Sequence, residues 1–260
     1  MRRLIAILII GLPLLIACLP LNPNPATEPP PPTETAPPSP TVIWFPPSAT
    51  ATLIAIPTYT ATPEMNPGIR SLIFADNFTD PTVWDTVTSA QANVTIKSNH
   101  LTLAVDPGTY IATLRRDVTL SNFYAELKAQ IGLCRGDDAY GLILRANGNS
   151  FYRLVFSCNG SIRAERIKNS VRLPILDPVL SGDMPLGPPG EVKIGIWAMG
   201  GEMRIFLNDH FQVSVNERTF PSGALGVFVQ SKGDTPMTMI FSDLKVYEVE
   251  YSPPISIATP

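Results

Sequence analysis

The stretch YGLILRANGNSFYRLVFSCNG, residues 140–160, decides the fold class, because two alternating runs flank a turn signal. Residues 140–145 and 151–157 place successive side chains on opposite faces, and both runs are rich in the aromatic and aliphatic residues typical of strands. Residues 147–149, Asn-Gly-Asn, favour a tight reversal of the chain between them. The stretch therefore predicts an antiparallel β-hairpin.

The same alternation recurs over most of the chain after residue 70. Turn-forming clusters such as Ser98-Asn99-His100 and Asn208-Asp209-His210 separate the runs, and strands joined by such short turns must be antiparallel. No long window outside the first twenty residues has a helical period. The sequence predicts an all-β, antiparallel domain, with further strands at residues 93–97, 101–105, 192–197, 203–207 and 211–215.

The chain has three cysteines, and two of them fall at the open end of the predicted hairpin. Cys158 follows the second run, and Cys134 precedes the first. A disulfide between them would close a loop of about 25 residues and stabilise the domain by roughly 3–4 kcal/mol on the chain-entropy model. The alternative is two free, buried thiols.

The third cysteine, Cys18, ends an N-terminal export signal. Met1-Arg2-Arg3 precedes an apolar run over residues 4–17, which is too short for a comfortable membrane span. Leu15-Ile16-Ala17-Cys18 resembles the bacterial lipobox. The resemblance implies cleavage after residue 17, acylation of the Cys18 thiol, and a protein exported and held by lipid on the outside of the cell membrane or outer membrane. A plain secreted protein, or an uncleaved helix with a chance cysteine, is the alternative.

Composition divides the rest of the chain. Residues 18–68 are rich in Pro and Thr, which favours a disordered and fairly stiff tether behind the lipid anchor. Residues 69–251 are expected to form one domain, and residues 252–260 a flexible tail. The formal net charge of −3 gives no basic field that would attract nucleic acid.

Several short motifs follow one another in a familiar order over residues 72–249. They are Phe74-Ala75-Asp76-Asn77-Phe78 with Trp84 downstream, then the runs at 140–145 and 151–154, and later those at 203–209, 223–227 and 240–246. Their order resembles that of concanavalin A-like lectin/glucanase domains, especially the laminin-G-like and 3-keto-disaccharide-hydrolase types. The resemblance implies a two-sheet antiparallel jelly-roll sandwich in which the first and last strands pair.

The residues do not favour catalysis. Lectin-like glucanases supply paired carboxylates as Glu-x-Asp-x-x-Glu, and this chain lacks that triplet. Glu165 and the other candidate glutamates read as solvated strand-edge residues. The only histidines, His100 and His210, lie in predicted turns. A non-catalytic domain is the prediction, although a keto-sugar hydrolase has no compact signature and stays open.

Carbohydrate recognition combines aromatic rings with planar hydrogen-bonding side chains, which makes Arg145, Arg153 and Trp197 the candidate ligand-binding residues. Alternation favours Arg145 and Arg153 on an exposed, concave sheet face, with Tyr140 and Tyr152 in the core. The resemblance also implies a structural Ca²⁺, with Asp76 and Asp243 as ligands, against the alternative of ordinary solvated or turn-capping aspartates. No other cofactor is expected.

The sequence thus predicts a surface lipoprotein that displays a lectin-like, glycan- or polysaccharide-binding sandwich. A structural or protein-interaction lipoprotein, with a surface protein as partner, is the main alternative. A glycoside-active hydrolase is the third.

Overall fold

A computed structural model describes residues 64–251 of the chain. The predicted signal at residues 1–17, the lipid site Cys18, most of the tether and the tail at 252–260 lie outside these residues. Between residues 64 and 251, no helix is long and apolar enough to cross a membrane.

The described part of the chain is built almost entirely of strands, as the alternation predicts. Its one helical element is the short 3₁₀ helix η1 (Pro81–Val83). The strands are β1 (Ile69–Asp76), β2 (Val87–Thr88), β3 (Ala92–Lys97), β4 (His100–Val105), β5 (Tyr110–Leu120), β6 (Phe123–Leu133), β7 (Ala139–Asn147), β8 (Ser150–Ser157), β9 (Ser161–Lys168), β10 (Val171–Leu180), β11 (Gly190–Met199), β12 (Glu202–Leu207), β13 (His210–Asn216), β14 (Gly223–Gln230) and β15 (Met237–Val249).

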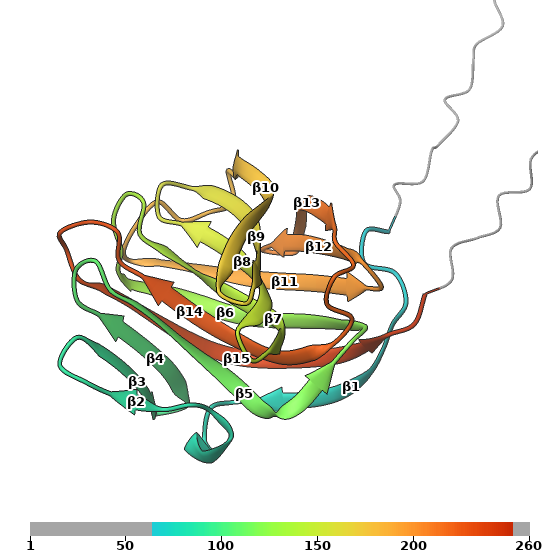
Figure 1. Ribbon diagram of the computed structural model, residues 1–260, viewed down its shortest axis with the longest axis horizontal. Coiled ribbons are helices and arrows are strands. Elements are labelled where there is room, and N and C mark those ends of the chain that lie inside the picture. Colours follow the sequence, from blue (N-terminus) through green and yellow to red (C-terminus); the bar gives the residue numbers. More distant parts are fainter. Residues whose placement is uncertain (1–63, 252–260) are drawn as a thin grey trace, which may run out of the picture. The chain divides into compact units, whose positions relative to one another are not determined.

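The strands form two antiparallel sheets packed face to face (Figure 1). The nine-stranded sheet has the order β13-β12-β11-β6-β15-β4-β3-β2, and β1 also pairs with β15. The six-stranded sheet has the order β10-β9-β8-β7-β14-β5. This arrangement confirms the predicted jelly-roll sandwich.

The predicted hairpin is β7 and β8, and its register explains the turn. Tyr140 pairs with Phe156 and Asn147 with Ser150, so Gly148, at a φ of 55°, lies in the reversal. Ser98 and Asn99 also have positive φ, as do Asn208 and Asp209, which suits the tight turns of twisted hairpins. The turn predictions are therefore confirmed.

The inner faces of the two sheets share one core, to which Tyr140, Leu142 and Leu144 of β7 contribute. Tyr140 and Tyr152 are fully buried, as predicted. The disulfide between Cys134 and Cys158 is present, with Cα atoms 6.0 Å apart, and it joins the chain after β6 to the chain after β8.

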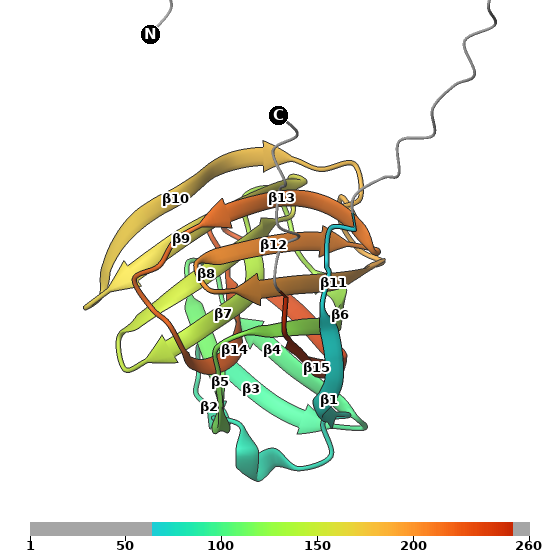
Figure 2. The same cartoon turned by 90° about the vertical axis from the view of Figure 1, so that its right-hand side faces the viewer.

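The first and last strands pair, as the resemblance implies, with Ile69 opposite Val249. The chain that leads into β1 lies over the outer face of the nine-stranded sheet (Figure 2). There the Pro67 carbonyl accepts a hydrogen bond from Trp197 of β11, and the Met65 carbonyl accepts one from Arg204 of β12. Residues 65–67, expected in the tether, thus pack against the domain.

Candidate functional site

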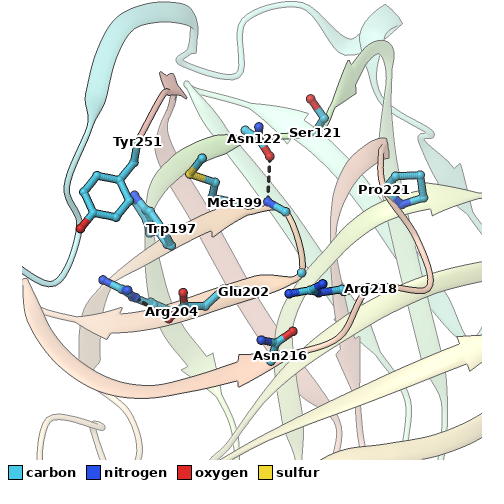
Figure 3. A pocket seen from close by; sticks show the side chains of 12 residues that line it. Ser121, Asn122, Trp197, Met199, Glu202, Arg204, Asn216, Arg218, Pro221 and Tyr251 are labelled. Carbon is cyan, nitrogen blue, oxygen red and sulfur yellow. Dashed lines mark hydrogen bonds and ion pairs between the residues drawn. The ribbon is translucent and has the colours of Figure 1, made fainter. Parts of the chain in front are cut away.

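A cavity of about 820 Å³ opens at one end of the nine-stranded sheet (Figure 3). Its walls come from segments far apart in sequence: the turn between β5 and β6, the β11–β12 hairpin, the chain after β13, and the end of the domain. The lining residues are Ser121, Asn122, Trp197, Met199, Gly200, Gly201, Glu202, Arg204, Asn216, Arg218, Pro221 and Tyr251.

Two of these walls are tied directly together. The side-chain oxygen of Asn122 accepts a hydrogen bond from the backbone N–H of Gly200 at 2.9 Å, drawn as the dashed line in Figure 3. This bond joins the β5–β6 turn to the β11–β12 turn. The cavity therefore has a fixed rim where the β5–β6 turn meets the turn of the β11–β12 hairpin.

Trp197 forms the aromatic wall of the cavity, but its ring is almost fully covered. Its indole N–H donates to the Pro67 carbonyl at 2.9 Å, and the Arg204 guanidinium lies 4.5 Å from the ring centroid. Tyr251 packs edge-on against it, with centroids 6.3 Å apart. Only 1% of Trp197 is exposed. The ring more open to a ligand is therefore Tyr251, which is half-buried.

The prediction that Arg145 lies on an exposed sheet face is wrong, because its side chain is 1% exposed. Its backbone has a φ of 52°, and the pairing of β7 with β8 shifts register between Leu144 and Asn147. A β-bulge of this kind breaks the strict alternation of a strand and re-aims the side chain.

Arg145 instead supports the cavity from behind. Its guanidinium donates to the carbonyls of Gly200 and Ser121, each at 2.6 Å, and to that of Phe220 at 3.2 Å. Gly200 and Ser121 line the cavity, and Phe220 precedes the lining residue Pro221. One buried side chain thus fixes three separate segments of the wall.

The cavity has an excess of positive charge. Arg204 pairs with Glu202, the single carboxylate of the lining, at 2.8 Å. Arg218 has no carboxylate partner within residues 64–251, and neither does Arg145. Burial lowers the pKa of the Arg145 guanidinium from its usual value. Electron-rich ligand groups are therefore favoured here over cations.

Arg153 lies on the other sheet, so the structure does not bring it together with Arg145 or Trp197. It points out from β8 on the six-stranded sheet, where it binds Glu165 of β9. The expectation of a solvated Glu165 is wrong: this carboxylate is 1% exposed and binds arginines.

Asp76 and Asp243 do not assemble a calcium site. The Asp76 carboxylate accepts hydrogen bonds from Trp84 and the backbone of Phe78 and pairs with Arg115, whereas Asp243 binds Lys128 at 3.0 Å. In the described chain no cluster of three or more His, Cys, Asp or Glu side chains could hold a metal. A carboxylate already bound to a guanidinium does not fit the oxygen cage that Ca²⁺ needs.

The sequence reasoning missed most of the cavity, including Asn122, Asn216, Arg218 and Tyr251. Gly200 and Gly201 favour a turn between β11 and β12, but nothing in the sequence shows that the β5–β6 turn lies beside it. His100 and His210, expected in turns, are instead the exposed first residues of β4 and β13, directly after those turns.

Comparison with known proteins identifies the fold. No family model and no curated protein matches the chain. Among solved structures, carbohydrate-binding module CBM66 from Bacillus subtilis matches with a TM-score of 0.52 and 18% identity, over 64% of this chain and 96% of that one. A protein of unknown function with a galectin-like fold, also from Bacillus subtilis, matches with a TM-score of 0.52 and 10% identity, over 70% and 99%.

A third similar structure is an enzyme. The catalytic domain of an endo-1,3-β-glucanase (laminarinase) from Thermotoga petrophila matches with a TM-score of 0.51 and 9% identity, over 70% of this chain and 98% of that one. The domain is a concanavalin A-like β-sandwich. At these identities the likeness establishes the fold and leaves the activity to the site.

Proposed function

We propose that this chain is a surface lipoprotein whose sandwich is a non-catalytic carbohydrate-binding module. The cavity of Figure 3 is the observation that carries the proposal. The ring of Tyr251 lies at one side of a hollow of about 820 Å³, and planar polar side chains, Asn216 and Arg218 among them, line its other side. An aromatic ring can cover the C–H face of a sugar, while amide and guanidinium groups hydrogen-bond its hydroxyls.

The lining favours binding over hydrolysis. Glycoside hydrolysis with two acidic groups needs a pair of carboxylates flanking the bond that is cut. The cavity contributes only Glu202, and Arg204 holds that carboxylate in an ion pair. A ligand in this cavity therefore meets no second acidic group.

Surface display rests on the sequence of the first eighteen residues. A lipid on Cys18, followed by a Pro- and Thr-rich spacer, would hold the domain at a distance from the membrane where it can reach polysaccharide.

A glycan-array screen of the full-length chain, purified in detergent, tests the binding function. We expect selective binding that weakens roughly 5- to 10-fold in Tyr251→Ala, which removes an aromatic contact. Asn216→Ala should weaken it as well. Phe211→Ala, which removes a different exposed ring on β13, is the matched control and should bind normally. Absence of binding by the folded wild type across the array would refute the proposal.

One observation favours the protein-interaction alternative. The edge strand β10 carries exposed apolar side chains, of which Val171 is 60% and Leu180 is 80% exposed. Pro174 and Pro178 lie within the same strand and limit the addition of another strand to this edge. Sedimentation of the purified chain tests whether β10 mediates self-association, because a contact between two copies through β10 would give a defined oligomer.

A further inference from the structure

The outer face of the six-stranded sheet holds a cluster of charged side chains around one buried carboxylate. Glu165 of β9 accepts a hydrogen bond from the Arg153 Nε at 2.8 Å and binds Arg163 at 3.1 Å and Arg172 at 2.8 Å. A single negative charge thus orients three guanidinium groups. The cluster is positive, although the whole chain has a formal net charge of −3.

Two of these arginines line a hollow of about 420 Å³. Arg163 and Arg172 form part of its wall together with Lys232, and the polar side chains of Asn159 and Ser161 face the same space. Asp137 is the one acidic residue of the lining, and its oxygen accepts a hydrogen bond from the Asn159 amide at 2.8 Å. The lining therefore carries more positive than negative charge.

The cations of this hollow retain unused donors. Arg163 spends its Nε on Glu165 and its Nη1 on the Ser157 hydroxyl, at 2.9 Å. Arg172 reaches Glu165 through one terminal nitrogen, while 56% of its side chain stays exposed. Lys232 has no acidic side chain within ion-pair distance in residues 64–251.

The surroundings of Lys232 also carry more positive than negative charge. Burial and the positive charges of Arg163 and Arg172 lower the pKa of its ammonium. Nearby Asp138 is fully buried, and it accepts hydrogen bonds from the backbone N–H groups of Lys232 and Gly233. An anion placed in the hollow would relieve the repulsion among the three cations.

A second hollow, of about 310 Å³, shares Arg172 with the first. Its lining includes the rings of Tyr110 and Phe151 together with Arg153. The Arg153 guanidinium also lies 5.6 Å from the Tyr110 ring centroid. A cationic hollow and an aromatic hollow thus lie on either side of one arginine.

We propose that the hollow at Arg163, Arg172 and Lys232 binds an oxyanion, the carboxylate or sulfate group of an acidic polysaccharide whose neighbouring sugar occupies the aromatic hollow. Guanidinium groups recognise such oxygens through paired, charge-assisted hydrogen bonds. This site lies on the opposite sheet from the cavity at Trp197. Only the identification of the ligand as a glycan rests on the proposed function.

Titration of the full-length chain with inorganic sulfate tests the anion site. We expect sulfate binding, followed by calorimetry, to weaken roughly tenfold or more in Arg172→Gln, because one charge-assisted contact is lost. Lys232→Gln should weaken it also. The matched control is Arg116→Gln, which removes an exposed arginine from β5, the opposite edge strand of the same sheet. Absence of sulfate binding by the wild type, or equal binding by Arg172→Gln and the wild type, would overturn the anion site.

Polymers then identify the ligand. Polygalacturonate presents carboxylates, dextran sulfate presents sulfates, and dextran is the uncharged counterpart. We expect at least one charged polymer to bind, dextran not to compete with it, and the binding to fall in Arg172→Gln while Tyr251→Ala leaves it unchanged. Sulfate binding without binding of either charged polymer would reject the glycan identification. Loss of neutral-glycan binding in the array bears only on the cavity.

Discussion

Arg145 brings a positive charge into the end of the core, where backbone carbonyls alone receive it. Replacing it with methionine keeps much of the side-chain volume but leaves the carbonyls of Ser121, Gly200 and Phe220 without their donor. Because each buried acceptor left unpaired costs free energy, we expect Arg145→Met to lower the free energy of unfolding by about 3 kcal/mol or more. Urea denaturation measures this loss.

The same variant tests the link between Arg145 and the cavity. Arg218→Met, at an exposed position of the lining, is the control and should leave the free energy of unfolding unchanged. Arg145→Met should weaken glycan binding even though residue 145 lies outside the lining. A variant as stable as the wild type would show that the three carbonyls find other donors.

Glu165 gives the domain a pH dependence of known sign. Burial raises the pKa of its carboxyl group, but the hydrogen bond and charge of Arg153, with Arg163 and Arg172, outweigh burial and hold the pKa below its usual 4.5. The ionised group therefore stabilises the folded state fully above pH 4.5, and this stabilisation is lost as the pH falls through the lowered pKa.

Glu165→Gln isolates this contribution. We expect the wild type to exceed the variant in free energy of unfolding at neutral pH, and the difference to shrink at an acidic pH below the lowered pKa of Glu165, where the wild-type carboxyl takes up a proton. Urea unfolding curves at both pH values measure it. A difference that stays constant with pH would mean that the Glu165 charge does not stabilise the fold.

At the scale of single residues, the sequence predicts which regular strand residues are buried better than it predicts the location of an individual charged side chain. Tyr140 and Tyr152 are in the core as alternation predicts, because β7 and β8 are regular there. Arg145 departs from the alternation because it has a positive φ at a β-bulge. The residue types in the sequence do not indicate this bulge. The sequence alone does not predict the cluster at Glu165, because its arginines come from three strands, β8, β9 and β10.

Among the elements, the β7–β8 hairpin is stabilised by a disulfide bond. The Cys134–Cys158 bridge spans a sequence separation of 24 residues, and it lies at the open end of this hairpin. Removing it gives the unfolded chain more freedom, so the double variant Cys134→Ala/Cys158→Ala should lose roughly 3–4 kcal/mol of unfolding free energy. Guanidinium denaturation measures the loss.

Reduction of the wild type provides the control for that variant. Treatment with a thiol reductant should bring the wild type to the midpoint of the double variant and leave the variant itself unmoved. Equal midpoints for oxidised and reduced wild type would contradict a stabilising bridge.

Strands and turns were the most predictable level of this structure. A period of two, broken by Asn, Gly and Asp, gave the hairpins β3–β4, β7–β8 and β12–β13 because these contacts are local. The pairing of β6 with β11 and β15 joins residues far apart in the chain, and no local pattern encodes it. For that reason the cavity at the β5–β6 and β11–β12 turns could not be foreseen.

For the whole molecule, the order of motifs was enough to predict a sandwich with paired first and last strands. The order of motifs could not predict where the side chains of Arg145, Arg153 and Trp197 lie. The location of each side chain depends on the sheet to which its strand belongs and on the end of that sheet at which the residue lies. The anchor at Cys18 and the tether stay predictions, because they lie outside residues 64–251.

Cys18→Ser tests the anchor in cells. Without the thiol there is no site for the lipid, so we expect the variant to move from the membrane fraction to the soluble fraction or the medium. Cell fractionation followed by immunoblotting measures this, with Arg116→Gln, which leaves both residue 18 and the disulfide intact, as the control. Full retention of Cys18→Ser in the membrane would rule out the lipobox interpretation.

The pairing of Ile69 with Val249 places the two ends of the sandwich opposite each other on neighbouring antiparallel strands. A domain whose two termini lie close together can be inserted into a loop of a host protein without forcing the flanking residues of that loop apart. The coding segment for residues 64–251 can therefore be spliced into a surface loop of an unrelated protein and should fold there as a cassette. Such portability would let recombination move this domain between architectures, as a mid-chain insert as readily as at the end of a tether.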